Sequence, residues 1–150
     1  MSRRTTALAA ALAVLVLGSP LMTGCSAQPN VVEEVSNTAA DLSSEDTLAL
    51  NDRIAELTEL IETNPQDAAA YNNRGNAKDD LGDTQGAIAD YNKAIDINPQ
   101  LADAYYNRGL SKGVSGDFQG SCFDIRNASL LRSQDAINTL LELKQMGLCQ

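Results

Sequence analysis

Two stretches of the chain decide its fold, because the second repeats the first. Residues 68–100 read AAAYNNRGNAKDDLGDTQGAIADYNKAIDINPQ, and residues 102–134 read ADAYYNRGLSKGVSGDFQGSCFDIRNASLLRSQ. Tyr71 and Tyr105 are 34 residues apart, and at the same offset Asn-Arg-Gly and Gly-Asp recur behind each tyrosine. A match at one period over so many positions indicates that the chain is built from copies of one supersecondary unit.

The residue types within the unit predict two packed helices. Small residues recur where helix axes approach closely, and tyrosines fill the wedges between helices. The two Gly-Asp pairs each read as a helix stop followed by an N-cap. Aromatic residues make up only 4% of the chain and tryptophan is absent, so the core is expected to be all-α, with small side chains between helices. The small positions are Gly75, Ala87, Ala94, Gly109, Ser121 and Ala128.

A 34-residue unit of this pattern resembles the tetratricopeptide repeat (TPR), a helix-turn-helix motif. The first unit, residues 67–100, carries nearly the full set of signature residues, and the second, residues 101–134, is a degenerate copy. In the second unit Ser121, Ile125 and Ser133 replace the usual alanine, aromatic residue and proline. The resemblance implies an all-α fold, a short TPR-like α-solenoid of antiparallel helix pairs with flanking capping helices.

The flanks are expected to supply neighbours for the two units, since a repeat buries its face only on another helix. Residues 44–66 are predicted to form the second helix of an eroded repeat, capped by Ser43 or Ser44 and followed by Pro65. Its apolar face is Leu50, Ile54, Leu57 and Ile61. Residues 135–150 are predicted to hold a capping helix that begins after Asp135 and stops at Gly147. Its buried side is expected to be Ile137, Leu140, Leu141 and Leu143.

The N-terminal segment has the pattern of an export signal. Within residues 1–24, Arg3 and Arg4 give a positive start and are followed by an apolar run over 7–17. Residues 21–25, Leu-Met-Thr-Gly-Cys, resemble the lipobox of bacterial lipoproteins, which implies that Cys25 is lipidated; cleavage after Ala27 is the alternative. Polar residues 26–43 are then expected to form a flexible tether behind the lipidated cysteine. In a cell with two membranes, a serine after the lipidated cysteine favours the periplasmic face of the outer membrane.

The number of cysteines agrees with this interpretation. An exported protein with three cysteines has one left over unless that residue has another use, and lipidation of Cys25 provides one. Cys122 and Cys149 then remain as a candidate disulfide. Two buried free thiols are the alternative, because the sequence does not show whether the two Cα atoms come within bridging distance.

Composition excludes several classes of function. The chain has no histidine, which removes the commonest general base and the usual zinc sites. The net charge of −9 argues against nucleic acid as a partner. The acids around Asp79, Asp80 and Asp83 lack the spacing of a calcium loop, and nothing pairs two carboxylates across a cleft. We therefore expect no catalytic residue, no metal and no cofactor.

The TPR resemblance implies a concave groove lined by the first helix of each unit, a surface that binds peptides or proteins. Asn73 and Asn107 have an alternative role, bonding backbone groups between helices. Arg74 and Arg108 are expected to pair with Asp90 and Asp124 along the stack. The Lys-Asn-Arg clamp of some chaperone-binding TPR domains is not expected, because the matching positions lack lysine. By repeat position the groove residues are Asn72, Asn73, Asn76, Asp79, Asp103, Tyr106, Asn107 and Leu110.

Together these features predict an exported lipoprotein that docks other envelope proteins or peptides while a lipid holds it to the membrane. Assembly or scaffolding of an envelope complex is the expected role. The alternative is a structural envelope protein that associates with itself as a homo-oligomer and has no peptide ligand.

Overall fold

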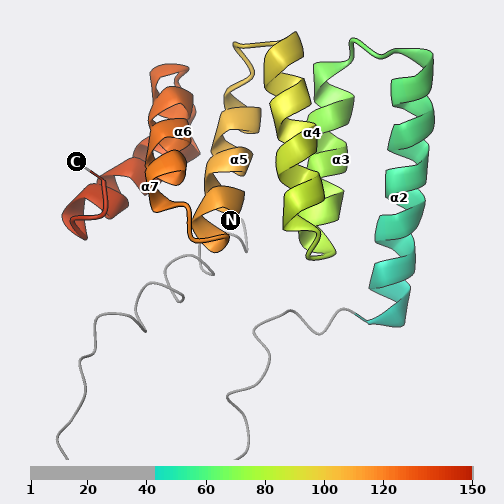
Figure 1. The fold of residues 1–150 in the computed structure, drawn as a ribbon, viewed down its shortest axis with the longest axis horizontal. Coiled ribbons are helices and arrows are strands. Elements are labelled where there is room, and N and C mark those ends of the chain that lie inside the picture. Colours follow the sequence, from blue (N-terminus) through green and yellow to red (C-terminus); the bar gives the residue numbers. More distant parts are fainter. Residues whose placement is uncertain (1–42, 150) are drawn as a thin grey trace, which may run out of the picture. The chain divides into compact units, whose positions relative to one another are not determined.

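The computed structural model describes residues 43–149, and this part of the chain contains six helices and no strand (Figure 1). The predicted signal peptide, Cys25 and all of the tether except Ser43 lie outside the described residues. The helices are α2 (Ser44–Thr63), α3 (Ala68–Asp80), α4 (Thr84–Ile97), α5 (Ala102–Val114), α6 (Phe118–Leu130) and α7 (Gln134–Gln145).

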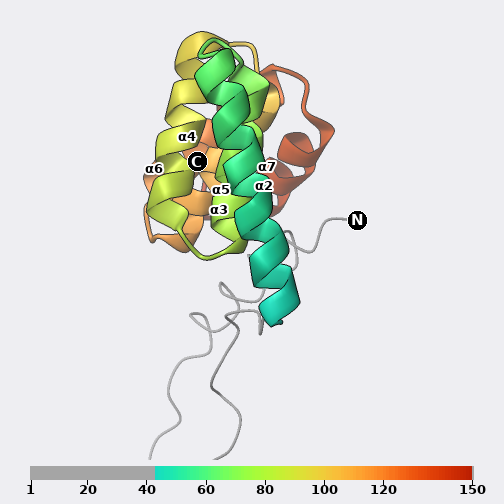
Figure 2. The same cartoon turned by 90° about the vertical axis from the view of Figure 1, so that its right-hand side faces the viewer.

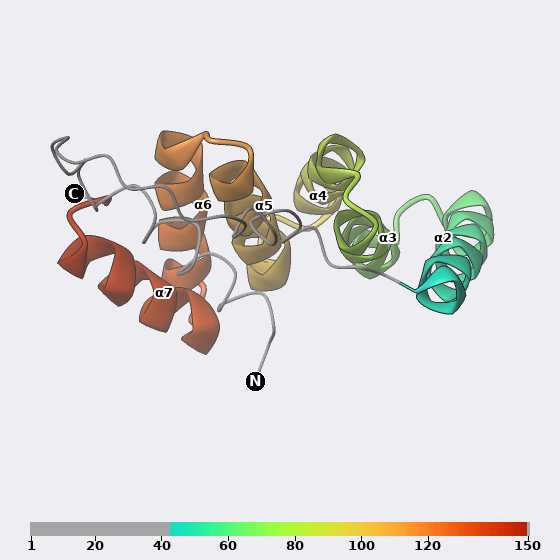
Figure 3. The same ribbon diagram turned by 90° about the horizontal axis from the view of Figure 1, so that it is seen from below.

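The helices follow one another along the domain, and each packs on its neighbours in sequence. Helices α3 and α4 form one antiparallel pair and α5 and α6 form the next, with α2 at one end and α7 at the other (Figures 1 and 2). Seen from below, α4 and α6 lie on one side of the stack and α3 and α7 on the other (Figure 3). The first and second helices of the two units begin 34 residues apart, so the predicted helix pairs are confirmed.

The turns inside the two units follow the Gly-Asp prediction. Gly82 and Gly116 adopt φ values of 85° and 87°, a region that side chains with a Cβ rarely enter. Asp83 then accepts a hydrogen bond from the amide of Gly86 at 3.0 Å, and Asp117 accepts one from Gly120 at 2.9 Å. Each turn therefore ends one helix and caps the next within three residues.

The turn between α6 and α7 copies this geometry without a glycine, and the cap predicted for α7 is wrong. Arg132 has φ 67°, and Ser133 rather than Asp135 caps α7, accepting from the amide of Ala136 at 3.3 Å. The prediction that Leu141 lies on the buried side of α7 is also wrong, because this residue is 55% exposed. It stands two residues before the buried Leu143, which places it about 200° around the helix from the packed face.

Glycines allow the paired helices to approach closely. A Cβ atom added at Gly75 would lie 2.6 Å from Cε1 of Tyr91, whose side chain is completely buried. In the second pair, a Cβ at Gly109 would lie 2.9 Å from Cγ1 of Ile125. In each unit a glycine therefore faces a buried side chain, an aromatic ring in the first and an aliphatic chain in the second.

A buried carboxylate joins the two helices of the first unit. Asp90 on α4 accepts hydrogen bonds from Nε and Nη2 of Arg74 at 2.9 and 2.7 Å, and Nζ of Lys78 lies 2.8 Å away. Burial alone would raise the pKa of Asp90, but the hydrogen bonds from Arg74 and Lys78 outweigh it and lower that pKa. Arg74 also donates from Nη1 to Oγ1 of Thr58 on α2 at 3.2 Å, so one guanidinium connects three helices.

The second unit repeats this arrangement. Asp124 on α6 is fully buried and accepts from Nε and Nη2 of Arg108 at 2.8 and 2.7 Å, with Nζ of Lys112 at 2.8 Å. Nη1 of Arg108 donates to Oδ1 of Asn92 on the preceding α4 at 2.6 Å. The predicted pairing of each arginine with an aspartate along the stack is confirmed, and a lysine one turn later completes each cluster.

Replacing Gly75 with alanine should lower the free energy of unfolding by about 1–3 kcal/mol, because the added methyl group collides with the Tyr91 ring. Helix propensity alone predicts the opposite sign, a gain of roughly 0.5–1 kcal/mol. Urea unfolding followed by circular dichroism measures the difference.

Ala89→Gly provides the matched control, since Ala89 is exposed in the middle of α4 and should lose only the propensity term. A Gly75→Ala protein that is more stable than the wild type would contradict the close approach of α3 and α4.

Candidate functional site

The candidate groove is the face presented by the first helices, α3 and α5, together with α7, and hydrogen bonds between side chains run across it. On α5, Asn107 donates from Nδ2 to Oδ1 of Asn72 on α3 at 3.2 Å. The bond joins equivalent helices of successive units. The alternative predicted for Asn107, a bond to backbone groups of an adjacent helix, is wrong, because its partner is a side chain.

A second set of contacts centres on Asp79 near the end of α3. The Tyr91 hydroxyl lies 2.8 Å from Oδ1 of Asn76 and 3.3 Å from Oδ2 of Asp79, and its proton points to one of these acceptors. The hydroxyl of Ser111 on α5 donates to the same Asp79 carboxylate. Asp79 therefore connects its own unit to the next one.

Tyr106 carries the network from α5 to α7. Its hydroxyl lies 3.1 Å from Oγ1 of Thr139. Burial raises the pKa of Tyr106, and the negative charges of Asp135 and Glu142 act in the same direction against the hydrogen bond to Thr139. The Tyr106 hydroxyl thereby links α5 to α7 through Thr139.

The predicted groove residues differ in how far a ligand can reach them. Asn72 and Leu110 are only 7% and 6% exposed, so they support the face from beneath. Asp103 is exposed, and the remaining five are partly exposed. Whether these residues bind a ligand stays a prediction.

Two polar residues of this network, Ser111 and Thr139, were not predicted. Ser111 lies one turn after Asn107, where the first unit has Ala77, and Thr139 lies on the packed face of α7. Only the pairing of helices from different units brings Ser111 to Asp79 and Thr139 to Tyr106.

Amide, hydroxyl and carboxylate groups on one face suit recognition of a peptide through hydrogen bonds, since amides both donate and accept. Within residues 43–149 no group of three or more acidic or cysteine side chains is arranged to hold a metal ion. Among the described helices, none combines the length and apolar character needed to cross a bilayer.

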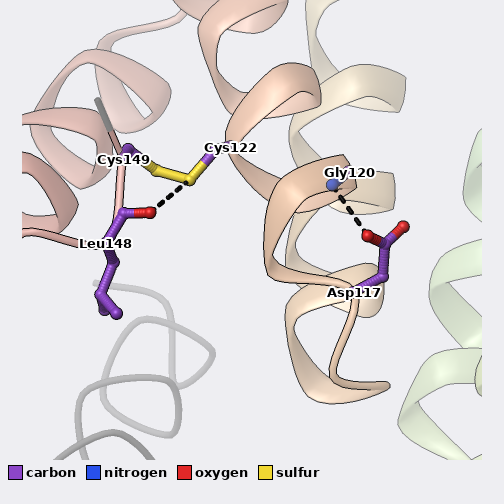
Figure 4. The surroundings of a disulfide bond; sticks show 5 residues. All are labelled: Asp117, Gly120, Cys122, Leu148 and Cys149. Carbon is purple, nitrogen blue, oxygen red and sulfur yellow. Dashed lines mark hydrogen bonds between the residues drawn. A yellow bond between two sulfur atoms is a disulfide. The ribbon is translucent and has the colours of Figure 1, made fainter.

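A disulfide fastens the C-terminal end of the chain to the second unit. Cys122 on α6 is bonded to Cys149, with Cα atoms 5.6 Å apart (Figure 4). Sγ of Cys122 also lies 3.3 Å from the carbonyl oxygen of Leu148, a close contact, because a disulfide sulfur carries no hydrogen to donate. The bond ties the segment that follows α7 to α6.

Comparison with known proteins identifies this arrangement of helices. The family model of the TPR repeat matches residues 80–113, and no curated protein matches the chain. The TPR domain of Arabidopsis OM64 is similar at a TM-score of 0.61 and 26% identity, covering 68% of this chain and 86% of that one. The complex of the yeast Sti1 TPR2B domain with pHsp70 is similar at a TM-score of 0.59 and 22% identity, covering 68% of this chain and 90% of that one. The second TPR domain of human RPAP3, in complex with an HSP70 peptide, is similar at a TM-score of 0.57 and 19% identity, covering 71% of this chain and 95% of that one.

Removing the disulfide should lower the free energy of unfolding by about 3–4 kcal/mol, because the bond closes a loop between residues 27 apart. We expect thermal unfolding of a Cys122→Ala/Cys149→Ala protein to occur at a lower temperature than in the wild type. Reductant should bring the wild type close to the double variant and leave the variant unchanged. Equal unfolding of the wild type with and without reductant would show that the bond does not stabilise the domain.

Proposed function

We propose that this chain, whose described residues form an all-α TPR-like solenoid, is a lipid-anchored docking protein of the bacterial cell envelope. Its groove between α3, α5 and α7 binds protein or peptide segments and brings them together at the membrane. Assembly of an envelope complex is the role that follows. The observation that carries the proposal is the row of hydrogen-bonding side chains along one face of the repeat stack.

Membrane attachment is supported by the sequence ahead of the domain. The apolar run over 7–17 is too short for a comfortable permanent membrane span, whereas the lipobox-like residues 21–25 supply a cysteine for lipidation. The strong negative charge of the chain does not favour binding to anionic headgroups, so the lipid on Cys25 is the attachment. Ser26 directs the anchored protein to the periplasmic face of the outer membrane in a cell with two membranes.

Peptide binding is supported by the fold and by the groove's chemistry. TPR domains are generally interaction modules rather than enzymes. The yeast Sti1 domain described above is in complex with pHsp70, and the human RPAP3 domain is in complex with an HSP70 peptide. The groove of this chain differs from a lysine-containing carboxylate clamp, since Asn72 and Asn76 occupy the corresponding positions. Its partly exposed asparagines, Asn73, Asn76 and Asn107, suit the backbone of an extended segment, and Tyr106 adds a rigid ring.

Cys25→Ser should move the protein from the membrane fraction to the soluble fraction and abolish incorporation of labelled palmitate, because no other residue is proposed to attach lipid. Fractionation and fluorography of cells expressing each form measure both effects. The Cys122→Ala/Cys149→Ala protein is the matched control and should keep the label. Retention of palmitate by Cys25→Ser would contradict the anchor.

Asn73→Lys/Asp103→Lys should abolish capture of partners, because two added cations change the groove's charge and hydrogen bonding without touching its buried residues. The measurement is crosslinked co-purification of the lipidated protein from its native envelope, with captured proteins identified by mass. Gln85→Lys/Asp96→Lys makes the same chemical changes at exposed positions of α4 and should capture as the wild type does.

Loss of one defined set of proteins by the groove variant alone supports a docking function. Capture of nothing but this chain, equally in all forms, would contradict it and favour self-association.

A further inference from the structure

Helix α2 is the second helix of a repeat whose first helix is missing from the described residues. Thr58 on α2 accepts a hydrogen bond from the Arg74 guanidinium, and Asn92 on α4 accepts one from Arg108 in the same way. Thr58 and Asn92 are 34 residues apart, the period of the repeat. The contacts therefore place α2 in register with α4, one unit earlier.

This register shows which side of α2 has no helix packed on it within residues 43–149. Leu60 corresponds to Ala94 and Ala128, which are both fully buried, yet Leu60 is 45% exposed. Leu57 corresponds to Tyr91 and Ile125, which are also fully buried, and is only partly buried itself. An apolar strip remains where complete units have a helix–helix contact.

The same register assigns a charge partner to the missing helix. Glu56 corresponds to Asp90 and Asp124, the carboxylates that an arginine and a lysine one turn apart hold in the complete units. Glu56 is exposed, and no cation of the described part of the chain pairs with it. The position thus offers a carboxylate to an Arg-x-x-x-Lys helix.

Neither the positions one period before Arg74 and Lys78 nor a second copy of α2 offers that pair of cations. The residues one period before Arg74 and Lys78 are Ala40 and Ser44, which carry no charge. Helix α2 has six carboxylates and one cation, Arg53, so two α2 helices brought face to face would repel each other. The Arg-Lys pairs on α3 and α5 are already bound to Asp90 and Asp124.

We propose that α2 is a docking site for an amphipathic helix of another protein. That helix presents an arginine and a lysine one turn apart to Glu56 and an apolar side chain to Leu57 and Leu60. Arg53 occupies the position of the buried Ala87 and Ser121, so the docked helix lies farther from α2 than α3 lies from α4. The site is separate from the groove and does not depend on its proposed function.

A stapled peptide provides a defined probe for this site. It has the sequence of residues 67–82, which contains the Arg74 and Lys78 pair, and a hydrocarbon staple between positions 69 and 73 holds it helical. Fluorescence anisotropy measures binding of the labelled peptide to the full-length protein in detergent. A charge-swapped peptide carries Glu at both basic positions.

We expect saturable binding that Glu56→Lys weakens by about tenfold or more, because the substitution replaces attraction with repulsion. The charge-swapped peptide should prefer the Glu56→Lys protein over the wild type. Glu59→Lys makes the same change of charge at the counterpart of the exposed Lys93 and should alter binding by less than about twofold. The groove variant Asn73→Lys/Asp103→Lys should bind the probe as the wild type does, which separates this site from the groove.

Absence of saturable binding, or equal weakening by Glu56→Lys and Glu59→Lys, would overturn the proposal. So would sedimentation equilibrium showing a dimer that Leu60→Asp dissociates, since a second copy would then cover the strip. Leu141→Asp on α7, at a similarly exposed leucine, is the control for that substitution.

Discussion

The stack depends on a carboxylate that is buried between the two helices of each unit. Asp124 is inaccessible to solvent and Asp90 nearly so, and a buried carboxylate left without a cation costs about 3–5 kcal/mol. Its cations come from the first helix of the same unit, so neither helix is stable in place without the other. Because Arg74 and Arg108 also bond to the preceding second helix, the same interaction fixes how one pair stacks on the next. Pairing and stacking are therefore linked through one side chain.

Much of this arrangement could be predicted because repetition supplies evidence that a single segment lacks. The 34-residue offset predicted the helix pairs, the Gly-Asp turns and the arginine–aspartate contacts, since each appears twice in the sequence. The start of α7 could not be predicted in that way. Arg132 takes the left-handed conformation that glycine has in the other turns, and nothing local identifies an arginine in that role. Likewise Ser111 and Thr139 gain their partners only from helices in other units, which residue type alone does not reveal.

The two ends of the solenoid are finished differently. At the C-terminal end α7 packs against α6, and the Cys122–Cys149 bond holds the chain there. At the other end of the described residues, α2 packs on α3 and leaves Leu57 and Leu60 partly or largely accessible. Repeat arrays usually protect both terminal faces, because an uncovered repeat exposes the surface that a neighbour would bury. Within residues 43–149, a helix and a covalent bond protect the C-terminal face, and no helix covers Leu57 and Leu60 in the same way.

The chemistry of the open end selects the helix that covers it. In water Glu56 is well solvated, so the free protein pays no penalty for the lone carboxylate. A helix that covers Leu57 and Leu60 removes that water, and the carboxylate becomes costly unless the incoming helix supplies cations. An apolar helix without an arginine or lysine at the right place is thereby rejected, even though it could bury the leucines. The carboxylate–cation interaction that holds each complete unit together thus decides, at α2, which partner helices can bind.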